Sequence, residues 1–226
     1  MRVTISALLF TAALAAVLWS CGGCATHRSW LSRVQQVRHE IGASLSLSVH
    51  CSDGNKYLGR AVALGPRYAV TASHVVRCQD IAHPVQVMVS RDGMEPIEVV
   101  VDAVLVGADA ARLVVAGKGS FDEWASLSLA PASIGDTVCS VSGMHITVRK
   151  CGDVVDADSD QFKASFRTIP GNSGSPVYNS FGEVVGIIIA GPHPMFANQF
   201  EHYGIASSVS ALKELVIFEA PDLMDG

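Results

Sequence analysis

The chain has 226 residues, of which 49% are hydrophobic and 16% are charged, so it has enough apolar material for a sizeable core and is not a largely disordered protein. Its formal net charge is −5, and its 16 Lys and Arg residues are scattered along the chain. Because no basic run or stripe is present, the composition argues against a nucleic-acid partner.

The N-terminal segment, residues 1–20, has the pattern of an export signal. Arg2 supplies a positive charge, and an almost unbroken apolar run follows from Ile5 to Trp19. This run is shorter than the roughly 20 residues that a membrane-spanning helix requires, which favours a cleaved leader over a permanent anchor. We therefore expect the mature protein to be exported, to the cell envelope on its periplasmic or extracellular side.

The end of this segment, Leu18-Trp19-Ser20-Cys21, resembles a bacterial lipoprotein box, in which the cysteine becomes a lipidated N-terminus. Trp19 departs from the small residue that is usual there, and ordinary cleavage near Ala25 or an uncleaved anchor are the alternatives. Lipid on Cys21 would attach the protein to a membrane surface without a spanning helix. Residues 21–40 would then form a tether to the folded domain, which we expect over residues 41–226.

From residue 44 onward, short runs rich in Val, Ile, Leu, Tyr and Phe are separated by Gly, Pro, Asp and Asn about every ten residues, which is typical of an all-β sandwich or barrel. Strands are predicted at residues 44–49, 57–64, 68–72, 85–89, 97–105, 111–115, 137–141, 146–151, 161–166, 175–178, 184–190 and 203–206. Val209, Leu212, Leu215 and Val216 then recur at helical spacing, which predicts a C-terminal helix.

Four of the six cysteines lie in the predicted domain, namely Cys51, Cys78, Cys139 and Cys151. Four cysteines permit three pairings. Cys139 and Cys151 lie in two apolar segments joined by a short loop, which favours a cross-strand bridge between them and leaves Cys51 to pair with Cys78. Zinc is the competing use of cysteine, but Cys21-x-x-Cys24 has no second pair at zinc-finger spacing, so no metal is predicted.

Two short motifs carry a histidine and an aspartate next to apolar strands. His74 lies in TASHVV, residues 71–76, at the end of one strand. Asp109 lies in ADAARL, residues 108–113, directly before another. Each alone has a simpler explanation: a lone histidine is more often a surface or core residue, and a lone aspartate more often caps a turn.

The third motif, GNSGSPV at residues 171–177, is more specific. Glycines on both sides of Ser173 remove bulk and permit unusual backbone angles, so that its hydroxyl can project and the N–H groups of Gly171 and Ser173 can converge as an oxyanion hole. A Gly/Ser-rich hairpin turn is the alternative. Serine is a poor nucleophile unless a base takes its proton and a third group orients that base. We therefore assign Ser173 as nucleophile, His74 as general base and Asp109 as the orienting carboxylate.

The three motifs, with GEVVGI at residues 182–187 and YGIASSV at residues 203–209, resemble the chymotrypsin-like serine peptidases over about residues 41–218. The bacterial HtrA/Deg enzymes and the staphylococcal glutamyl endopeptidases are the most similar types, and the order His, Asp, Ser is that of the family. The resemblance implies an all-β, trypsin-like fold of two perpendicular six-stranded antiparallel barrels with the active site between them. It implies a protein or peptide substrate, and neither a cofactor nor a metal.

The resemblance also has departures. Asn172 stands where animal digestive members have an aspartate that binds a newly cut N-terminus, so we expect no zymogen step of that kind. The PDZ module that usually follows an HtrA/Deg peptidase domain is not expected here. The substrate pocket implied by the resemblance is mostly small or apolar, which favours small to medium aliphatic residues before the cut. Arg167 could face this pocket and favour an acidic residue instead, but a solvated loop arginine is the favoured alternative. Its expected lining residues are Thr168, Ile189, Ala190, Gly191 and Ala206.

Two other functions compete with a serine endopeptidase. An α/β-hydrolase esterase needs the pattern Gly-x-Ser-x-Gly and a histidine after the serine, but Ser175 takes the place of the second glycine. A catalytically inactive trypsin-like domain could instead bind a peptide or protein partner in the same cleft. Because all three triad positions are filled, the sequence favours the enzyme.

Overall fold

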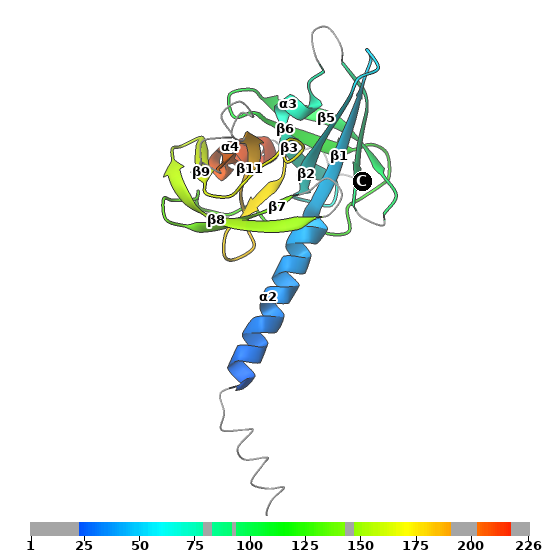
Figure 1. The fold of residues 1–226 in the computed structure, drawn as a ribbon. Coiled ribbons are helices and arrows are strands. Elements are labelled where there is room, and N and C mark those ends of the chain that lie inside the picture. The colour runs from blue at the N-terminus through cyan, green and yellow to red at the C-terminus, as the bar shows by residue number, and fades with distance from the viewer. Residues whose placement is uncertain (1–22, 79–82, 92–93, 143–146, 191–202, 218–226) are drawn as a thin grey trace, which may run out of the picture. The chain divides into compact units, whose positions relative to one another are not determined.

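The computed structural model describes residues 23–78, 83–91, 94–142, 147–190 and 203–217 (Figure 1). The chain divides into two units, residues 1–38 and 39–226. The expected leader, residues 1–20, and the lipidation site Cys21 lie outside the described residues. Helix α2 (Gly23–Ala43) occupies most of the expected tether, for which no helix was predicted. In the described part of the chain, no helix combines the length and apolar character needed to cross a membrane.

The first six strands close into an antiparallel barrel in the order β1-β2-β3-β6-β5-β4. Alternate side chains fill its interior, including Leu47, Val62, Val70 and Leu113, all nearly or fully buried. One short helix, α3 (Ser73–Val76), follows the third strand. The strands are β1 (Ser44–Cys51), β2 (Lys56–Ala63), β3 (Tyr68–Ala72), β4 (Pro84–Ser90), β5 (Ile97–Leu105) and β6 (Ala110–Val115).

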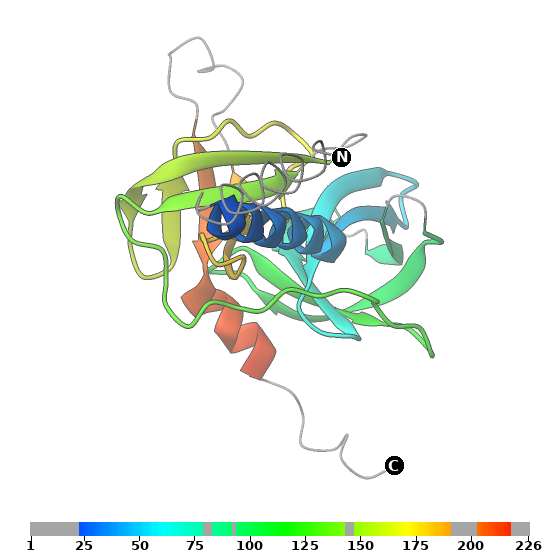
Figure 2. The ribbon, with the colours of Figure 1, turned by 90° about the horizontal axis from the view of Figure 1, so that it is seen from below.

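The last six strands close into a second antiparallel barrel, in the order β10-β11-β12-β9-β8-β7, and helix α4 (Val209–Ile217) follows. Figure 2 shows the barrels side by side, the first in cyan to green and the second in yellow-green to orange. The fold class predicted from the sequence is therefore confirmed. The strands are β7 (Thr137–Ser142), β8 (Val148–Ala157), β9 (Gln161–Ala164), β10 (Pro176–Tyr178), β11 (Val184–Ala190) and β12 (Gly204–Ser208).

Strand β8 is longer than predicted. The sequence indicated a strand that ended at Cys151, whereas β8 continues to Ala157. The residues after Cys151 are rich in Gly and Asp and have the composition of a turn. In the structure, Val154 is 2% exposed within the second barrel and pairs with Ala164 of β9, while its neighbours Asp153 and Val155 face outward. One buried residue and the ladder to β9 thus outweigh the low strand propensity of the acidic residues.

Helix α4 joins the two barrels. It follows β12 of the second barrel and packs against β5 and β6 of the first as well as β11 and β12. Arg112 of β6 donates from Nη1 to the Leu215 carbonyl (2.7 Å) and from Nε to Asp102 Oδ2 of β5 (2.6 Å). The helix therefore helps to fix the relative position of the two barrels, between which the candidate site lies.

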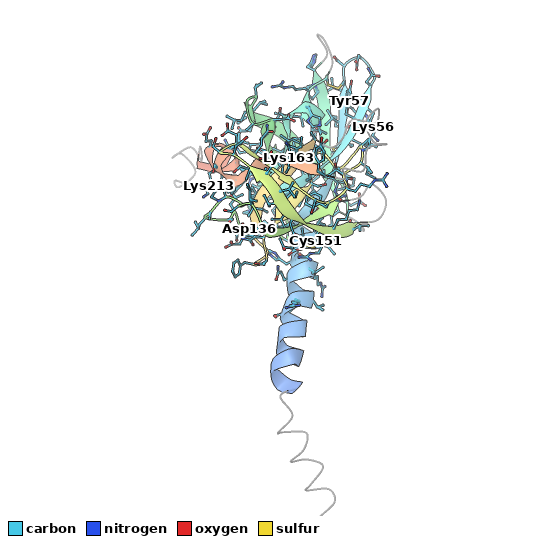
Figure 3. All side chains as sticks on the ribbon, turned by 60° about the vertical axis from the view of Figure 1, so that its left-hand side comes forward. Lys56, Tyr57, Asp136, Cys151, Lys163 and Lys213 are labelled. Carbon is cyan, nitrogen blue, oxygen red and sulfur yellow. A yellow bond between two sulfur atoms is a disulfide. The ribbon has the colours of Figure 1, made fainter. Side chains whose placement is uncertain are left out.

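Two disulfides, Cys51–Cys78 and Cys139–Cys151, join the pairs that the sequence favours. The first links the end of β1 to the residue two positions after α3, and so restrains the helix that carries His74. The second joins paired positions of β7 and β8, where Figure 3 labels Cys151. Such bonds are typical of an oxidising extracellular or periplasmic compartment.

Candidate active site

His74 and Asp109 meet at the ends of two paired strands. His74 lies in α3 directly after β3, and Asp109 directly precedes β6, whose first residue Ala110 pairs with Ala72. His74 Nδ1 lies 2.6 Å from Asp109 Oδ2, and the His74 backbone N–H donates to Asp109 Oδ1 at 2.9 Å. Because Nδ1 is engaged by the carboxylate, Nε2 is the ring nitrogen left to exchange a proton with a substrate or nucleophile.

The backbone of Asp109 is in an unusual conformation. Its φ is +50°, a left-handed value found at no other non-glycine residue in the described part of the chain. Its carbonyl oxygen accepts a hydrogen bond from the Ser73 N–H (2.9 Å), and its own N–H donates to Val106 (3.2 Å). Such strain persists where surrounding contacts over-determine it, and it is concentrated at functional sites.

Ser73 is a member of this site that the sequence analysis did not identify. It is 1% exposed, and its hydroxyl donates to Asp109 Oδ1 at 2.7 Å. Partial burial tends to raise the pKa of Asp109, but the hydrogen bonds from the His74 ring and the Ser73 hydroxyl, together with the His74 charge and backbone N–H, lower that pKa below its usual value. Asp109 is therefore ionised at neutral pH. The sequence signal that could have identified Ser73 is its position as a small polar residue directly before the motif histidine.

Removing the Ser73 hydroxyl should weaken this arrangement. A hydrogen bond to a charged group contributes about 1.5–3 kcal/mol, so Ser73→Ala should lower kcat/KM by about tenfold or more if the bond orients Asp109 for catalysis. Ser73→Thr, which keeps a hydroxyl, is the matched control and should lose less activity. Steady-state kinetics on a peptide substrate measure both; equal losses in the two variants would exclude a role for the hydroxyl.

The loop that carries Ser173 consists of two consecutive tight turns. The Asn172 N–H donates to the Ile169 carbonyl (3.0 Å), and the Ser175 N–H donates to the Asn172 carbonyl (2.9 Å). The third residues of the two turns, Gly171 and Gly174, have φ values of +89° and +84°, as a type II turn requires at that position. In the described part of the chain, neither the Gly171 N–H nor the Ser173 N–H has an acceptor, so both remain available to an oxyanion.

Both barrels hold this loop in place. The Ser173 carbonyl accepts from the Arg60 N–H of β2 (2.7 Å), and the Gly174 N–H donates to the Ile188 carbonyl of β11 (2.7 Å). A Cβ on Gly59 would lie 3.0 Å from the Ser173 carbonyl oxygen and 2.7 Å from Val75 Cγ1, so Gly59 lies between the Ser173 loop and the residue that follows His74. Ser173 thus lies next to α3, although no hydrogen bond joins it to His74 among the described residues. Such bonds are often long before substrate binds.

Gly174 should tolerate no side chain. A Cβ there would lie 1.8 Å from the Arg60 carbonyl oxygen, and the φ of +84° is itself unfavourable for other residues. We expect Gly174→Ala to lose about 1–3 kcal/mol of stability from each cause. Gly54→Ala is the matched control, since Gly54 has a φ of +85° and open space around its Cβ position. Urea unfolding of the two variants compares them; equal losses would mean that the close approach of Arg60 is unimportant.

Asn172 is buried behind the loop, where its Nδ2 donates to Ser142 Oγ of β7 (3.2 Å).

Of the expected pocket residues, Thr168, Ile189 and Ala206 are buried, Ala190 is exposed, and Gly191 lies outside the described residues. Ala206 packs in the core of the second barrel. Within the described ranges, no group of three or more His, Cys, Asp or Glu side chains could hold a metal ion.

Two closed six-stranded barrels, with the His–Asp pair on one and a Gly-flanked serine loop reaching across from the other, define the chymotrypsin-like class. Solved structures of serine proteases have this fold. The inactive form of the Rv3671c protease of M. tuberculosis H37Rv is 16% identical, with a TM-score of 0.65 over 82% of this chain and 93% of that one. A serine endoprotease from Yersinia pestis is 18% identical, with a TM-score of 0.67 over 81% of this chain and 64% of that one.

The family model described as a trypsin-like peptidase domain matches residues 59–187, more than half of the chain. The protein belongs to the trypsin-like peptidase family. A search of curated protein sequences finds no significant match.

Proposed function

We propose that this protein is a serine endopeptidase that hydrolyses peptide bonds of proteins through an acyl-enzyme intermediate. Ser173 is the nucleophile, His74 the general base and Asp109 the residue that orients it. The observation that carries the proposal is the 2.6 Å contact between His74 Nδ1 and Asp109 Oδ2. This contact leaves the other ring nitrogen, Nε2, to accept the proton of Ser173. No cofactor or metal takes part.

Each proton in the proposed cycle passes through His74. As Ser173 Oγ attacks the carbonyl carbon of the substrate, Nε2 of His74 takes its proton, and Asp109 stabilises the imidazolium that forms. The negative charge that develops on the carbonyl oxygen is met by the N–H groups of Gly171 and Ser173. Nε2 then gives the proton to the leaving amine as the C–N bond breaks. Water, deprotonated by His74, attacks the acyl-enzyme and releases Ser173 with its proton restored.

The same proposal places the enzyme outside the cytoplasm. The leader at residues 1–20 and the lipoprotein-like box at Cys21 would export it and attach it to a membrane by lipid, and the two disulfides are compatible with that compartment. Mass spectrometry of the N-terminus of the exported protein tests this part. A mature form that begins at an acylated Cys21 would support it, and an unmodified N-terminus elsewhere would contradict lipidation.

Cleavage of proteins by the purified, oxidised full-length chain tests the activity. The protein is incubated with a mixture of unfolded proteins, and new peptide termini are identified by mass spectrometry. Termini that appear with the wild type and are absent with His74→Ala are the expected result. Peptide binding without any new terminus, in a folded sample, would favour an inactive binding domain that uses the same cleft.

A further inference from the structure

Two ionisable side chains in the interior have no part in the chemistry proposed above. Glu40, in the last turn of α2, is fully buried, and Arg60 on β2 is 4% exposed. Glu40 pairs with Arg149 of β8, with 2.7 Å between Oε2 and Nε. The Arg60 guanidinium donates to Ser44 Oγ (2.9 Å) and Ser46 Oγ (2.8 Å) of β1. Burying charge is costly unless opposite charge or hydrogen bonds compensate for it.

Tyr178 contacts Glu40 through the backbone of that residue. Its hydroxyl, fully buried at the end of β10, donates to the Glu40 backbone carbonyl at 3.0 Å. Burial and the negative charge of Glu40 raise the pKa of Tyr178, while the positive charge of Arg60 opposes that rise. Arg60 lies at the same junction, because its guanidinium donates to Ser44 Oγ, on the first residue of β1 and four residues after Glu40. The cluster of Glu40, Arg60, Arg149 and Tyr178 lies where the end of α2 meets β2 of the first barrel and β8 and β10 of the second.

The backbone of Arg60 is in direct contact with the nucleophile loop. Its N–H donates to the Ser173 carbonyl (2.7 Å), and its carbonyl oxygen accepts from Thr71 Oγ1 (2.6 Å) three residues before His74. The same carbonyl oxygen lies 1.8 Å from the position that a Cβ on Gly174 would take. Because packing is this close, a displacement of β2 at Arg60 would move Ser173 relative to His74.

We propose that Glu40 is a positioning residue of the active site. Its carboxylate supplies negative charge to the buried cluster, which keeps Arg60 in place and so holds β2 against Ser173. Arg149 is 27% exposed and can turn toward water if Glu40 is lost, whereas Arg60 cannot. The inference rests on the proposed function, and it extends the catalytic unit to the end of α2, although the family model begins only at residue 59.

Replacing Glu40 with glutamine in the full chain tests this inference with two readouts. We expect Glu40→Gln to lower kcat by about tenfold or more with little change in KM. We also expect faster amide hydrogen exchange in the peptide that contains residues 169–176. Asp156→Asn is the matched control, because Asp156 is a carboxylate paired with Lys163 (2.9 Å) on the exposed face of β8 and β9. It should leave both readouts unchanged.

The double variant Glu40→Gln/Arg60→Gln separates this role from a general loss of stability. Removing both charges leaves no uncompensated cation in the interior, so the double variant should recover part of the kcat and exchange protection that the single variant loses. If the single variant does not fold, the double variant should. A double variant no better than the single one, or exchange unchanged in Glu40→Gln, would overturn the inference. Absence of turnover in the wild type would instead overturn the proposed function. The hydrogen-exchange readout would still decide whether Glu40 positions the Ser173 loop.

Discussion

Ser173→Ala should abolish peptide hydrolysis, lowering kcat on the order of 10⁶-fold, while the protein remains folded. In the proposed mechanism the Ser173 hydroxyl supplies the attacking oxygen, and no other group in the loop would replace it. The loop itself is held by backbone hydrogen bonds from Arg60 and to Ile188, which alanine at position 173 leaves in place. Turnover of a peptide substrate measures the loss of activity, and thermal unfolding of the same sample shows whether the protein remains folded.

Ser175→Ala is the matched control for Ser173→Ala, because it changes another serine of the same motif. The Ser175 hydroxyl is buried and has no hydrogen-bond partner among the described residues, so its removal should cost little activity. If Ser175→Ala lost as much activity as Ser173→Ala, or if Ser173→Ala still cleaved peptides at a comparable rate, the assignment of the nucleophile would be wrong.

Asp109→Asn should lower kcat by roughly 10⁴-fold. Asparagine fills the same space, but an amide NH₂ group facing His74 Nδ1 would favour the tautomer that carries its proton on Nε2, which cannot accept the proton of Ser173. The binding of a peptide should change much less than its turnover. Kinetics that resolve kcat from KM, with Asp102→Asn as a control on a carboxylate paired with Arg112, measure the effect. Equal losses in both variants would remove Asp109 from the proposed triad.

The same substitution should change the dependence of stability on pH. The folded-state pKa of Asp109 is lowered, so its ionised form stabilises the fold. That contribution is fully present above the unfolded-state pKa of about 3.9 and is lost as pH falls through the folded-state value. Urea unfolding at pH 7 and at pH 3 should therefore show a smaller loss of stability on acidification for Asp109→Asn than for the wild type.

The sequence predicted most of the strands because each carries its own signal of alternating or continuous apolar residues between turn residues. Their arrangement in two six-stranded barrels was implied only by the resemblance to the chymotrypsin-like peptidases. His74 and Asp109 are recognised by motif, and the pairing of β3 with β6 then places them together. The extension of β8 was missed because it depends on one buried valine in an acidic stretch, and on a ladder with β9 that no local window contains.

Helix α2 and the buried charge cluster were missed for different reasons. Trp30, Val34, Val37 and Ile41 recur at helical spacing, which is a signal for the helix, whereas the expectation for residues 21–40 was a tether without helix. Glu40 carried no signal, because an isolated glutamate is ordinarily a surface residue. Its burial follows from contacts with Arg149 and Tyr178, more than a hundred residues away in the chain, which sequence spacing does not reveal.

Labelling with a fluorophosphonate probe tests the central claim most directly, because the probe reacts covalently with an activated serine. The purified, oxidised protein is labelled and digested, and the modified residue is identified by mass spectrometry. The account predicts a label on Ser173 alone, lost in Ser173→Ala and strongly reduced in His74→Ala. A folded protein that takes no label, or takes it at another serine, would contradict the assignment of Ser173, His74 and Asp109 as a catalytic triad.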